Sequence, residues 1–310
     1  MKVYYDTTDF EPVANAIVTI GTFDGVHLGH KKILTRLGEI AQTSEGETVV
    51  LTFWPHPRMV VSKDSQSLRL LSTLDEKIEL LRQNGVNHLV VIPFTRSFSE
   101  LSSEEFIQQI LVNSIGTKKL VIGYDHHFGR NREGSFEYLK QNAFQYGFEL
   151  EEIPRQEIDN LTVSSTKIRH ALLEGKLKIA NELLGQNYTF SGVIVKGRQL
   201  GRTIGYPTAN VQVSESYKLI PADGVYAVRV LVRGQTYGGV ISIGFRPTVN
   251  GVGRTQEVFI FDFNEDIYGE KITVELVEYI RPELKFDGLE ALIKAIEADC
   301  QAAKLVLDLQ

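Results

Sequence analysis

The chain is poor in cysteine, in long apolar runs and in basic charge. Its 310 residues include one cysteine, Cys300, which cannot form an intramolecular disulfide, and a lack of disulfides is typical of proteins from reducing compartments. No apolar run approaches the roughly 20 residues that span a bilayer. The opening MKVYYDTTDF lacks the apolar core of a secretory signal. These absences predict a cytoplasmic protein with no membrane partner.

The charge balance argues against a further class of protein. Acidic residues outnumber basic ones, 39 to 33, which gives a net charge of −6. A protein that coats nucleic acid needs a basic face to neutralise phosphates, so we expect no nucleic-acid partner. A few arginines and backbone amides can still hold a nucleotide. Hydrophobic residues at 43% and charged residues at 23% are ordinary for globular domains, and the length allows two of them.

Hydrophobic patterns in the first half alternate between strand and helix. Apolar runs predict strands at Ala16–Ile20, Thr48–Phe53, His88–Pro93 and Lys119–Ile122. Capping boxes at Thr73/Glu76 and Ser102/Glu105 predict the starts of helices Leu74–Gln83 and Phe106–Ile115. This alternation predicts a parallel sheet that is covered on both faces and binds ligands at the carboxyl ends of its strands.

The second half has a different rhythm. Few helical intervals separate its β-rich segments, which are Asn187–Lys196, Val225–Arg233, Thr236–Ile243, Glu257–Phe263 and Ile272–Ile280. The spacing predicts an antiparallel barrel or sandwich, followed by an amphipathic helix from about Gly288 to Leu307. The rhythm changes near Gly185 without a low-complexity linker. We therefore expect two closely joined domains, residues 1–184 and residues 185–310.

A glycine-bearing turn connects the first of the predicted buried strands to a helix. It reads Gly-Thr-Phe-Asp-Gly-Val-His-Leu-Gly-His over residues 21–30, and such a turn offers backbone N–H groups and the positive end of a helix to an anion. His27 and His30 add two imidazole donors, so the segment predicts a polyphosphate site. A zinc site completed by His126 and His127 is the weaker alternative, because zinc sites usually include cysteine or carboxylate ligands.

Further motifs identify the kind of phosphate site. His27-Leu28-Gly29-His30 resembles the H-x-G-H element of nucleotidyltransferases. Three more segments resemble motifs of bacterial bifunctional riboflavin kinase/FAD synthetases: Phe53-Trp54-Pro55-His56-Pro57 (F-x-P-H-P), Gly123-Tyr124-Asp125-His126-His127-Phe128-Gly129 (G-x-D-F-R-F-G) and Ser164-Ser165-Thr166-Lys167-Ile168-Arg169 (S-S-T-x-I-R). The first half therefore resembles the FMN adenylyltransferase domain of this family.

The resemblance implies a Rossmann-like domain that transfers AMP from ATP to the phosphate of FMN and releases pyrophosphate. Mg²⁺ is implied by the charge to be neutralised. The ATP contacts that it implies are Gly21, Phe23, Asp24, His27, His30, Asp125, Ser165, Thr166 and Arg169, with His27 and His30 as catalytic residues. The implied flavin pocket is formed by Pro55, His56 and Pro57. His126-His127 replaces the usual Phe-Arg pair, so the basic contact expected there is either weakened or supplied by imidazole.

Riboflavin kinase motifs follow in the second half. Pro207-Thr208-Ala209-Asn210 resembles P-T-A-N, and Gly244-Phe245-Arg246-Pro247-Thr248 resembles N-x-G-x-x-P-T with Ser242 in place of the asparagine. The resemblance implies an antiparallel β-barrel kinase domain with a terminal helix, in which Thr208 and Asn210 hold Mg²⁺ and ATP. The ATP and flavin contacts that it implies are Gly197, Gly201, Arg202, Gly205, Pro207, Thr208, Asn210 and Arg281.

Glu257 is the candidate base of the kinase. All seven histidines lie at or before His170, so a base in the second half is a carboxylate, a lysine or a tyrosine. Strand alternation puts Glu257 on one face with two inward aromatics, Phe259 and Phe261, although geometry alone also allows it to face solvent. The resemblance implies that Glu257 takes the proton of the ribityl 5′-hydroxyl. Asp262 and a substrate-assisted route are the alternatives if Glu257 is not the base.

The implied function is conversion of riboflavin to FMN and of FMN to FAD. Its partners are small molecules: riboflavin, FMN and ATP. A flavin-binding sensor, and an enzyme that retains one of the two activities, are the alternatives.

Overall fold

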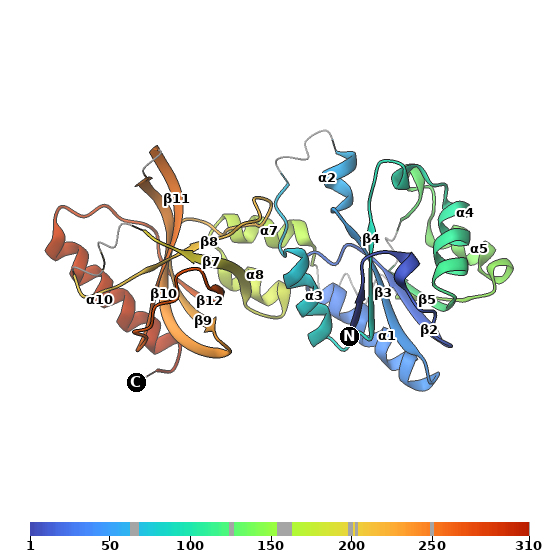
Figure 1. Cartoon of the computed structure of the whole chain (residues 1–310), viewed down its shortest axis with the longest axis horizontal. Coiled ribbons are helices and arrows are strands. Elements are labelled where there is room, and N and C mark those ends of the chain that lie inside the picture. Colours follow the sequence, from blue (N-terminus) through green and yellow to red (C-terminus); the bar gives the residue numbers. More distant parts are fainter. Residues whose placement is uncertain are drawn as a thin grey trace. The chain divides into compact units, whose positions relative to one another are not determined.

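The structure, a computed structural model, describes residues 1–62, 68–123, 127–153, 163–197, 201, 204–248 and 251–309. It consists of two compact units, Met1–Ser165 and Thr166–Gln310. The first holds a helix-covered sheet and the second a barrel (Figure 1).

The first unit is built on a six-stranded parallel sheet with the strand order β1-β4-β3-β2-β5-β6. The strands are β1 (Lys2–Tyr4), β2 (Ala16–Ile20), β3 (Glu47–Trp54), β4 (His88–Pro93), β5 (Thr117–Gly123) and β6 (Glu149–Ile153). All five residues of β2 are buried, as expected for a central strand with helices on both faces.

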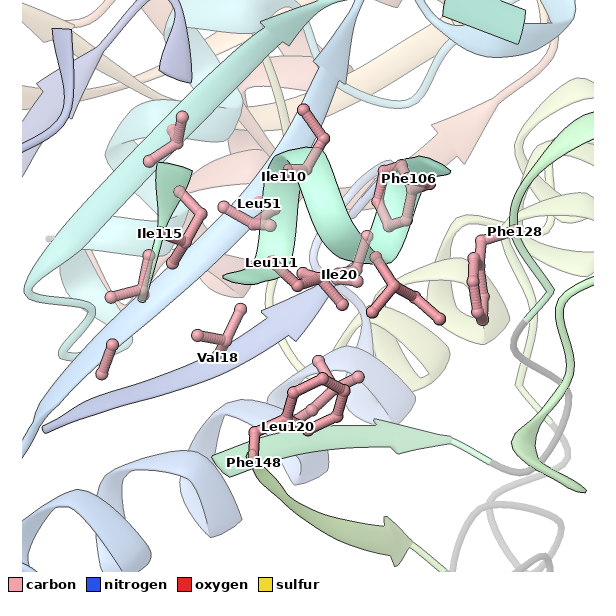
Figure 2. Packing of buried hydrophobic residues seen from close by; sticks show 14 of the residues in the cluster. Val18, Ile20, Leu51, Phe106, Ile110, Leu111, Ile115, Leu120, Phe128 and Phe148 are labelled. Carbon is pink, nitrogen blue, oxygen red and sulfur yellow. The ribbon is translucent and has the colours of Figure 1, made fainter. Parts of the chain in front are cut away.

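Helices cover both faces of this sheet. The helices that contribute side chains to the hydrophobic core are α1 (Leu28–Thr43), α3 (Leu74–Gln83), α4 (Ser103–Phe106), the π-helical η4 (Ile107–Ser114) and α5 (Phe136–Tyr146). Shorter helices are η1 (Thr7–Asp9), α2 (Pro57–Val61), η3 (Phe98–Glu100) and η5 (Arg130–Arg132). Val18 and neighbouring strand residues pack against α4 and η4 (Figure 2). The same cluster includes Leu139 and Ala143 of α5. Ile17, on the opposite side of β2, packs with α1 and α3.

The side on which successive strands are added to the sheet changes at β2, although all strands run parallel. Strands β3 and β4 lie on one side of β2, whereas β5 and β6 lie on the other. Open parallel sheets bind ligands beyond the carboxyl ends of their strands at such a change of side. The turn that carries His27 leaves β2 at this point.

The second unit is a closed antiparallel barrel with the strand order β10-β11-β8-β7-β12-β9. The strands are β7 (Tyr188–Val195), β8 (Ala209–Gln212), β9 (Gly224–Val232), β10 (Gln235–Thr248), β11 (Gly251–Ile260) and β12 (Lys271–Arg281). Helices α7 (Ser165–Leu173) and α8 (Leu177–Leu184) precede the barrel, and α10 (Leu289–Val306) follows it. Ala303 and Leu307 pack with Val225, Ala227 and Phe261, so the terminal helix covers one side of the barrel.

The architecture confirms the predicted parallel sheet and resolves the barrel-or-sandwich alternative in favour of the barrel. Both predicted capping boxes form, at Thr73 and at Ser102. Three strands were not predicted: β1, β6 and the four-residue β8. Edge strands β1 and β6 lack the continuous apolar run of a central strand, because each pairs with one neighbour. Strand β11 begins at Gly251 rather than at Glu257.

Helix α8 packs against the barrel. The Asn181 side chain donates to the carbonyl oxygen of Leu276 at 3.1 Å and accepts from the N–H of Tyr188 at 2.8 Å. The boundary between the compact units therefore lies at the start of α7, and a functional boundary after residue 184 stays a prediction. In the described part of the chain, every helix is too short or too polar to cross a membrane.

Candidate functional site

The turn between β2 and α1 ends in two stacked histidines. His27 caps α1, and its Nδ1 accepts the backbone N–H of His30 at 3.4 Å. The two imidazole rings lie 3.7 Å apart between centroids, at an interplanar angle of 14°. A neutral His27 that accepts through Nδ1 carries its proton on Nε2. Nε2 is then the ring nitrogen that can donate to a ligand oxygen.

His30 is placed to stay neutral near pH 7. Burial, then the neighbouring His27 and Lys77, hold the pKa of His30 well below its usual value of 6.5. Its Nδ1 is buried and has no hydrogen-bond partner among the residues that the structure describes. Phe23 packs against this ring at 5.0 Å between centroids. A buried polar atom of this kind is a candidate ligand contact.

Asp24 links the turn that carries His27 and His30 to the backbone before α3. Its Oδ1 accepts the backbone N–H groups of Leu71 at 2.8 Å and of Ser72 at 3.2 Å, and the Ser72 hydroxyl accepts the N–H of Gly25. Ser165 donates to the Asp24 carbonyl oxygen at 3.1 Å. The structure thus brings Ser165, more than 100 residues away in sequence, to the turn that carries His27 and His30.

Lys77 of α3 adds a buried cation to this cluster. Its side chain is 2% exposed, and its Nζ donates to the hydroxyl of Thr52 on β3 at 3.4 Å. Burial lowers the pKa of Lys77 to about 8, although the charge of Asp24 acts in the opposite direction. The sequence contained a usable signal, since Lys77 occupies the apolar face of α3 with Leu74, Ile78 and Leu81, where a charged residue is unusual.

The predicted flavin-pocket residues lie at the carboxyl end of β3. Pro57 is the first residue of α2, and His56 caps this helix by accepting the Arg58 N–H through Nδ1 at 3.2 Å. His56 is buried. With Nδ1 engaged, a neutral His56 presents Nε2–H as its remaining donor.

The rest of the predicted adenylyltransferase set is only partly described. Asp125 and His126 lie outside the described residues, and His127 is exposed. Thr166 and Arg169 lie one turn apart on α7, where Nη1 of Arg169 is 3.4 Å from the Thr166 hydroxyl.

Three predicted kinase residues meet where two barrel strands are neighbours: Asn210 lies on β8, Thr208 directly precedes β8, and Glu257 lies on β11. Glu257 of β11 is directly opposite Asn210 of β8 on one side and Ser242 of β10 on the other. The Thr208 hydroxyl is 3.4 Å from Oε2 of Glu257, and the Thr255 hydroxyl is 3.3 Å from Oε1. The carboxylate is therefore held between two hydroxyl donors, beside the Asn210 amide. Thr255 was not predicted, although it precedes Glu257 by two residues and so shares its face of the strand.

The two aromatic side chains that follow Glu257, Phe259 and Phe261, were predicted to point inward, but they face the terminal helix. Phe259 and Phe261 belong to the cluster that packs with α10, so they lie on the face of the barrel that this helix covers. Val258 and Ile260 alternate with them and are buried. Period-two alternation identifies which residues share a face, but it does not say which face points inward.

Two glycines of the predicted loop lie in close contact with neighbouring atoms. A Cβ at Gly197 would lie 2.1 Å from the Asn210 amide nitrogen, and a Cβ at Gly201 would lie 2.1 Å from the Tyr206 carbonyl oxygen. Gly205 has a positive φ of 85°, and Pro207 is exposed. Arg202 lies outside the described residues.

Arg281 is engaged away from this cluster in the described contacts. Its guanidinium binds Asp299 of α10 through two hydrogen bonds, at 2.8 and 2.7 Å, and lies over the ring of Phe286. Ser242, which stands where the family pattern has asparagine, donates to Oε1 of Glu283 at 3.0 Å.

Comparisons with known proteins match both halves. The FAD synthetase family model matches residues 10–167, and the riboflavin kinase family model matches residues 184–307. A bifunctional riboflavin kinase/FMN adenylyltransferase from Listeria monocytogenes is 41% identical over 95% of this chain and 93% of its own length. The Escherichia coli K12 protein of the same name is 38% identical over 93% of this chain and 91% of its own.

A solved structure has the same fold along the whole chain. It is described as a macrolide-efflux protein from Streptococcus pneumoniae, and it covers 98% of both chains with a TM-score of 0.88 and 33% identity.

Proposed function

This chain belongs to the family of bifunctional riboflavin kinase/FMN adenylyltransferases, and on that premise we propose where and how it performs the two reactions. The barrel transfers the γ-phosphoryl group of ATP to riboflavin, releasing ADP. The parallel-sheet unit transfers AMP from a second ATP to FMN, releasing pyrophosphate. The strongest support is that each unit gathers its own set of motif residues in space: Thr208, Asn210 and Glu257 in one, and His27 with His30 in the other.

Glu257 serves as the general base of the kinase. Hydroxyl groups of Thr208 and Thr255 contact one carboxylate oxygen each, which fixes the orientation of the carboxylate. The 5′-hydroxyl of the ribityl chain donates its proton to Glu257 as its oxygen attacks the γ-phosphorus and ADP departs. Phosphoryl transfer depends mainly on such positioning and on charge neutralisation.

The residues beside Glu257 fit a magnesium ion. The Thr208 hydroxyl and the Asn210 amide oxygen are hard donors, and Mg²⁺ characteristically takes few protein ligands beside substrate phosphates and water. When bound, the ion would neutralise negative charge on the ATP phosphates. The strand pairing of Asn210 with Glu257, and the contact of the Thr208 hydroxyl with the Glu257 carboxylate, keep both candidate magnesium ligands next to the base.

Adenylyl transfer needs no protein base, because the attacking group is already a phosphate anion. His27 and His30 hydrogen-bond the ATP phosphates, together with backbone N–H groups at the start of α1. Asp24 holds the turn through the backbone of Leu71 and Ser72. Ser165, Thr166 and Arg169 contribute hydroxyl and guanidinium donors, and His56 with its neighbouring prolines lines the flavin pocket.

Incubation of the purified protein with riboflavin and ATP tests the whole proposal. FMN should form first and FAD second, and chromatography resolves all three flavins. Binding of flavin without any turnover would instead support the sensor alternative. Formation of FMN without FAD would indicate that His126-His127, in place of the family's Phe-Arg pair, disables adenylyl transfer. If supplied FMN becomes FAD but riboflavin is not phosphorylated, Ser242 in place of the family's asparagine would be the suspected cause. A cytoplasmic location and the absence of a nucleic-acid partner stay predictions.

A further inference from the structure

A buried lysine is linked through one threonine to the turn that carries His27 and His30, and it has no part in the chemistry proposed above. Lys77 donates to the Thr52 hydroxyl, which in turn donates to the Thr22 carbonyl oxygen at 3.4 Å. Thr22 belongs to the turn that leads from β2 to His27. The Lys77 ammonium is thereby held against the turn, on the side of the sheet covered by α1 and α3.

The environment of Lys77 differs from that of a lysine in a tight structural ion pair. A tight pair raises the pKa of a lysine, because the partner stabilises the charged form. Here the Asp24 carboxylate also accepts two backbone N–H groups, and burial outweighs its attraction, so the pKa of Lys77 falls to about 8. The protein therefore stabilises this charge less well than water does, and an anion bound nearby would make up the difference.

The neighbouring His30 points to the same ligand. Its buried Nδ1 has no hydrogen-bond partner among the described residues. Burial and the nearby Lys77 keep its pKa low, so near pH 7 it contributes a dipole rather than a full charge. A polyphosphate carries several negative charges, and Lys77 provides a full positive charge that a neutral imidazole does not.

We propose that Lys77 is a positioning residue for adenylyl transfer, whose buried ammonium draws the ATP polyphosphate onto the turn that carries His27 and His30. This inference rests on the proposed function of the first unit. Lys77 acts through the electric field at the site and through the Thr52 link to the turn. Electrostatic attraction of this kind is strong at a buried site, where water screens little.

The pH dependence of Lys77→Met measures this role. At saturating FMN, kcat/KM for ATP reports groups of the enzyme form that binds ATP, before ATP is bound. In the native protein it should fall as pH rises through about 8, where Lys77 loses its charge. In the variant, kcat/KM should be about 10- to 100-fold lower at pH 7 and nearly constant to pH 9.5, where the two curves approach within a few-fold. A purely structural role predicts the same loss at every pH.

Two further variants separate Lys77 from its neighbours. Lys77→Arg keeps a charge that does not titrate in this range, so the fall near pH 8 should disappear while activity at pH 7 largely persists. Lys31 of α1 is the matched control, because burial also lowers its pKa. Lys31→Met should keep the fall near pH 8. The titratable groups that face Lys77 are Asp24 and His30, with His27 stacked behind, and the lowered pKa of His30 places its titration below this range.

The outcomes distinguish this inference from the proposed function. Riboflavin phosphorylation in the same samples should be unaffected by Lys77→Met, which shows that the barrel is folded. An unchanged circular dichroism spectrum and unfolding temperature would show the same for the unit that holds Lys77. A native protein that makes no FAD from FMN would overturn the adenylyltransferase assignment itself. FAD formation with a constant ratio between native protein and variant across pH would overturn the role of Lys77 alone. If Lys77→Met does not fold, a native profile that is flat through pH 8 overturns it equally.

Discussion

Replacing Glu257 by glutamine removes the proposed base of the kinase and preserves the shape of the side chain. The two contacts of the carboxylate are long, at 3.4 Å to Thr208 and 3.3 Å to Thr255. Glutamine can still accept one of them through its oxygen. The loss of one such hydrogen bond costs about 1 kcal/mol, which lowers the unfolding temperature by roughly 2–6 °C.

The expected effect on catalysis is much larger than this structural cost. Loss of a general base reduces the rate by roughly 10²–10⁴-fold, equivalent to about 2.7–5.5 kcal/mol. A loose transition state, in which the attacking hydroxyl has gained little charge, favours the lower end. A domain that is stable by at least about 5 kcal/mol stays almost entirely folded after losing 1 kcal/mol, so unfolding cannot explain a hundredfold loss.

Both activities of Glu257→Gln can be followed in one tube by resolving riboflavin, FMN and FAD over time. FMN formation should nearly stop, whereas supplied FMN should still become FAD and riboflavin should still bind. Glu278→Gln provides the matched control, because it makes the same chemical change at an exposed position of β12. Phosphorylation of riboflavin at the native rate would refute the assignment and direct attention to Asp262 or to a substrate-assisted route.

Three other changes test separate parts of the proposal. His30→Ala should reduce FAD formation from FMN by about 10²–10³-fold and leave FMN formation unchanged; equal loss of both activities in folded protein would contradict the assignment of one site to each unit. Thr255→Val should slow riboflavin phosphorylation about fivefold by removing one hydroxyl donor to Glu257, and Thr255→Ser should restore it. Residues 185–310 should phosphorylate riboflavin alone, and residues 166–310 should melt at a higher temperature because α8 packs on the barrel. A folded, flavin-binding but inactive 185–310 fragment would refute this boundary.

The elements that the sequence predicted well are those whose surroundings are uniform. The central strands β2 and β4 are buried on both faces, so their apolar runs mark them, and each capping box at Thr73 or Ser102 is local in sequence. The barrel site was harder to derive from the residues. Thr208, Asn210 and Glu257 come together only because β8 and β11 are neighbours in the barrel, and β8 is too short to show a strand pattern.

The environment of buried charges was the hardest feature to predict from the sequence, because their partners come from distant parts of the chain. Lys77 could be noticed as a charged residue on an apolar helix face, yet its contact with Thr52 and its proximity to Asp24 and His30 depend on how α1, α3 and β3 pack. Similarly, Arg281 was predicted as an ATP or flavin contact, and its ion pair with Asp299 appears only once α10 is placed on the barrel.

The two reactions place opposite electrostatic demands on their sites, and the described residues differ accordingly. In adenylyl transfer the acceptor phosphate is already an anion and must approach another anion, so positive charge and hydrogen-bond donors reduce the barrier. The site proposed for it combines Lys77, two histidines and a helix N-terminus. In the kinase the acceptor is a neutral alcohol, so a carboxylate that can accept a proton is needed. There Glu257 is surrounded by the neutral hydroxyl and amide groups of Thr208, Thr255 and Asn210. These neutral donors orient the carboxylate, and the positive charge that the ATP phosphates require is left to the Mg²⁺ proposed above.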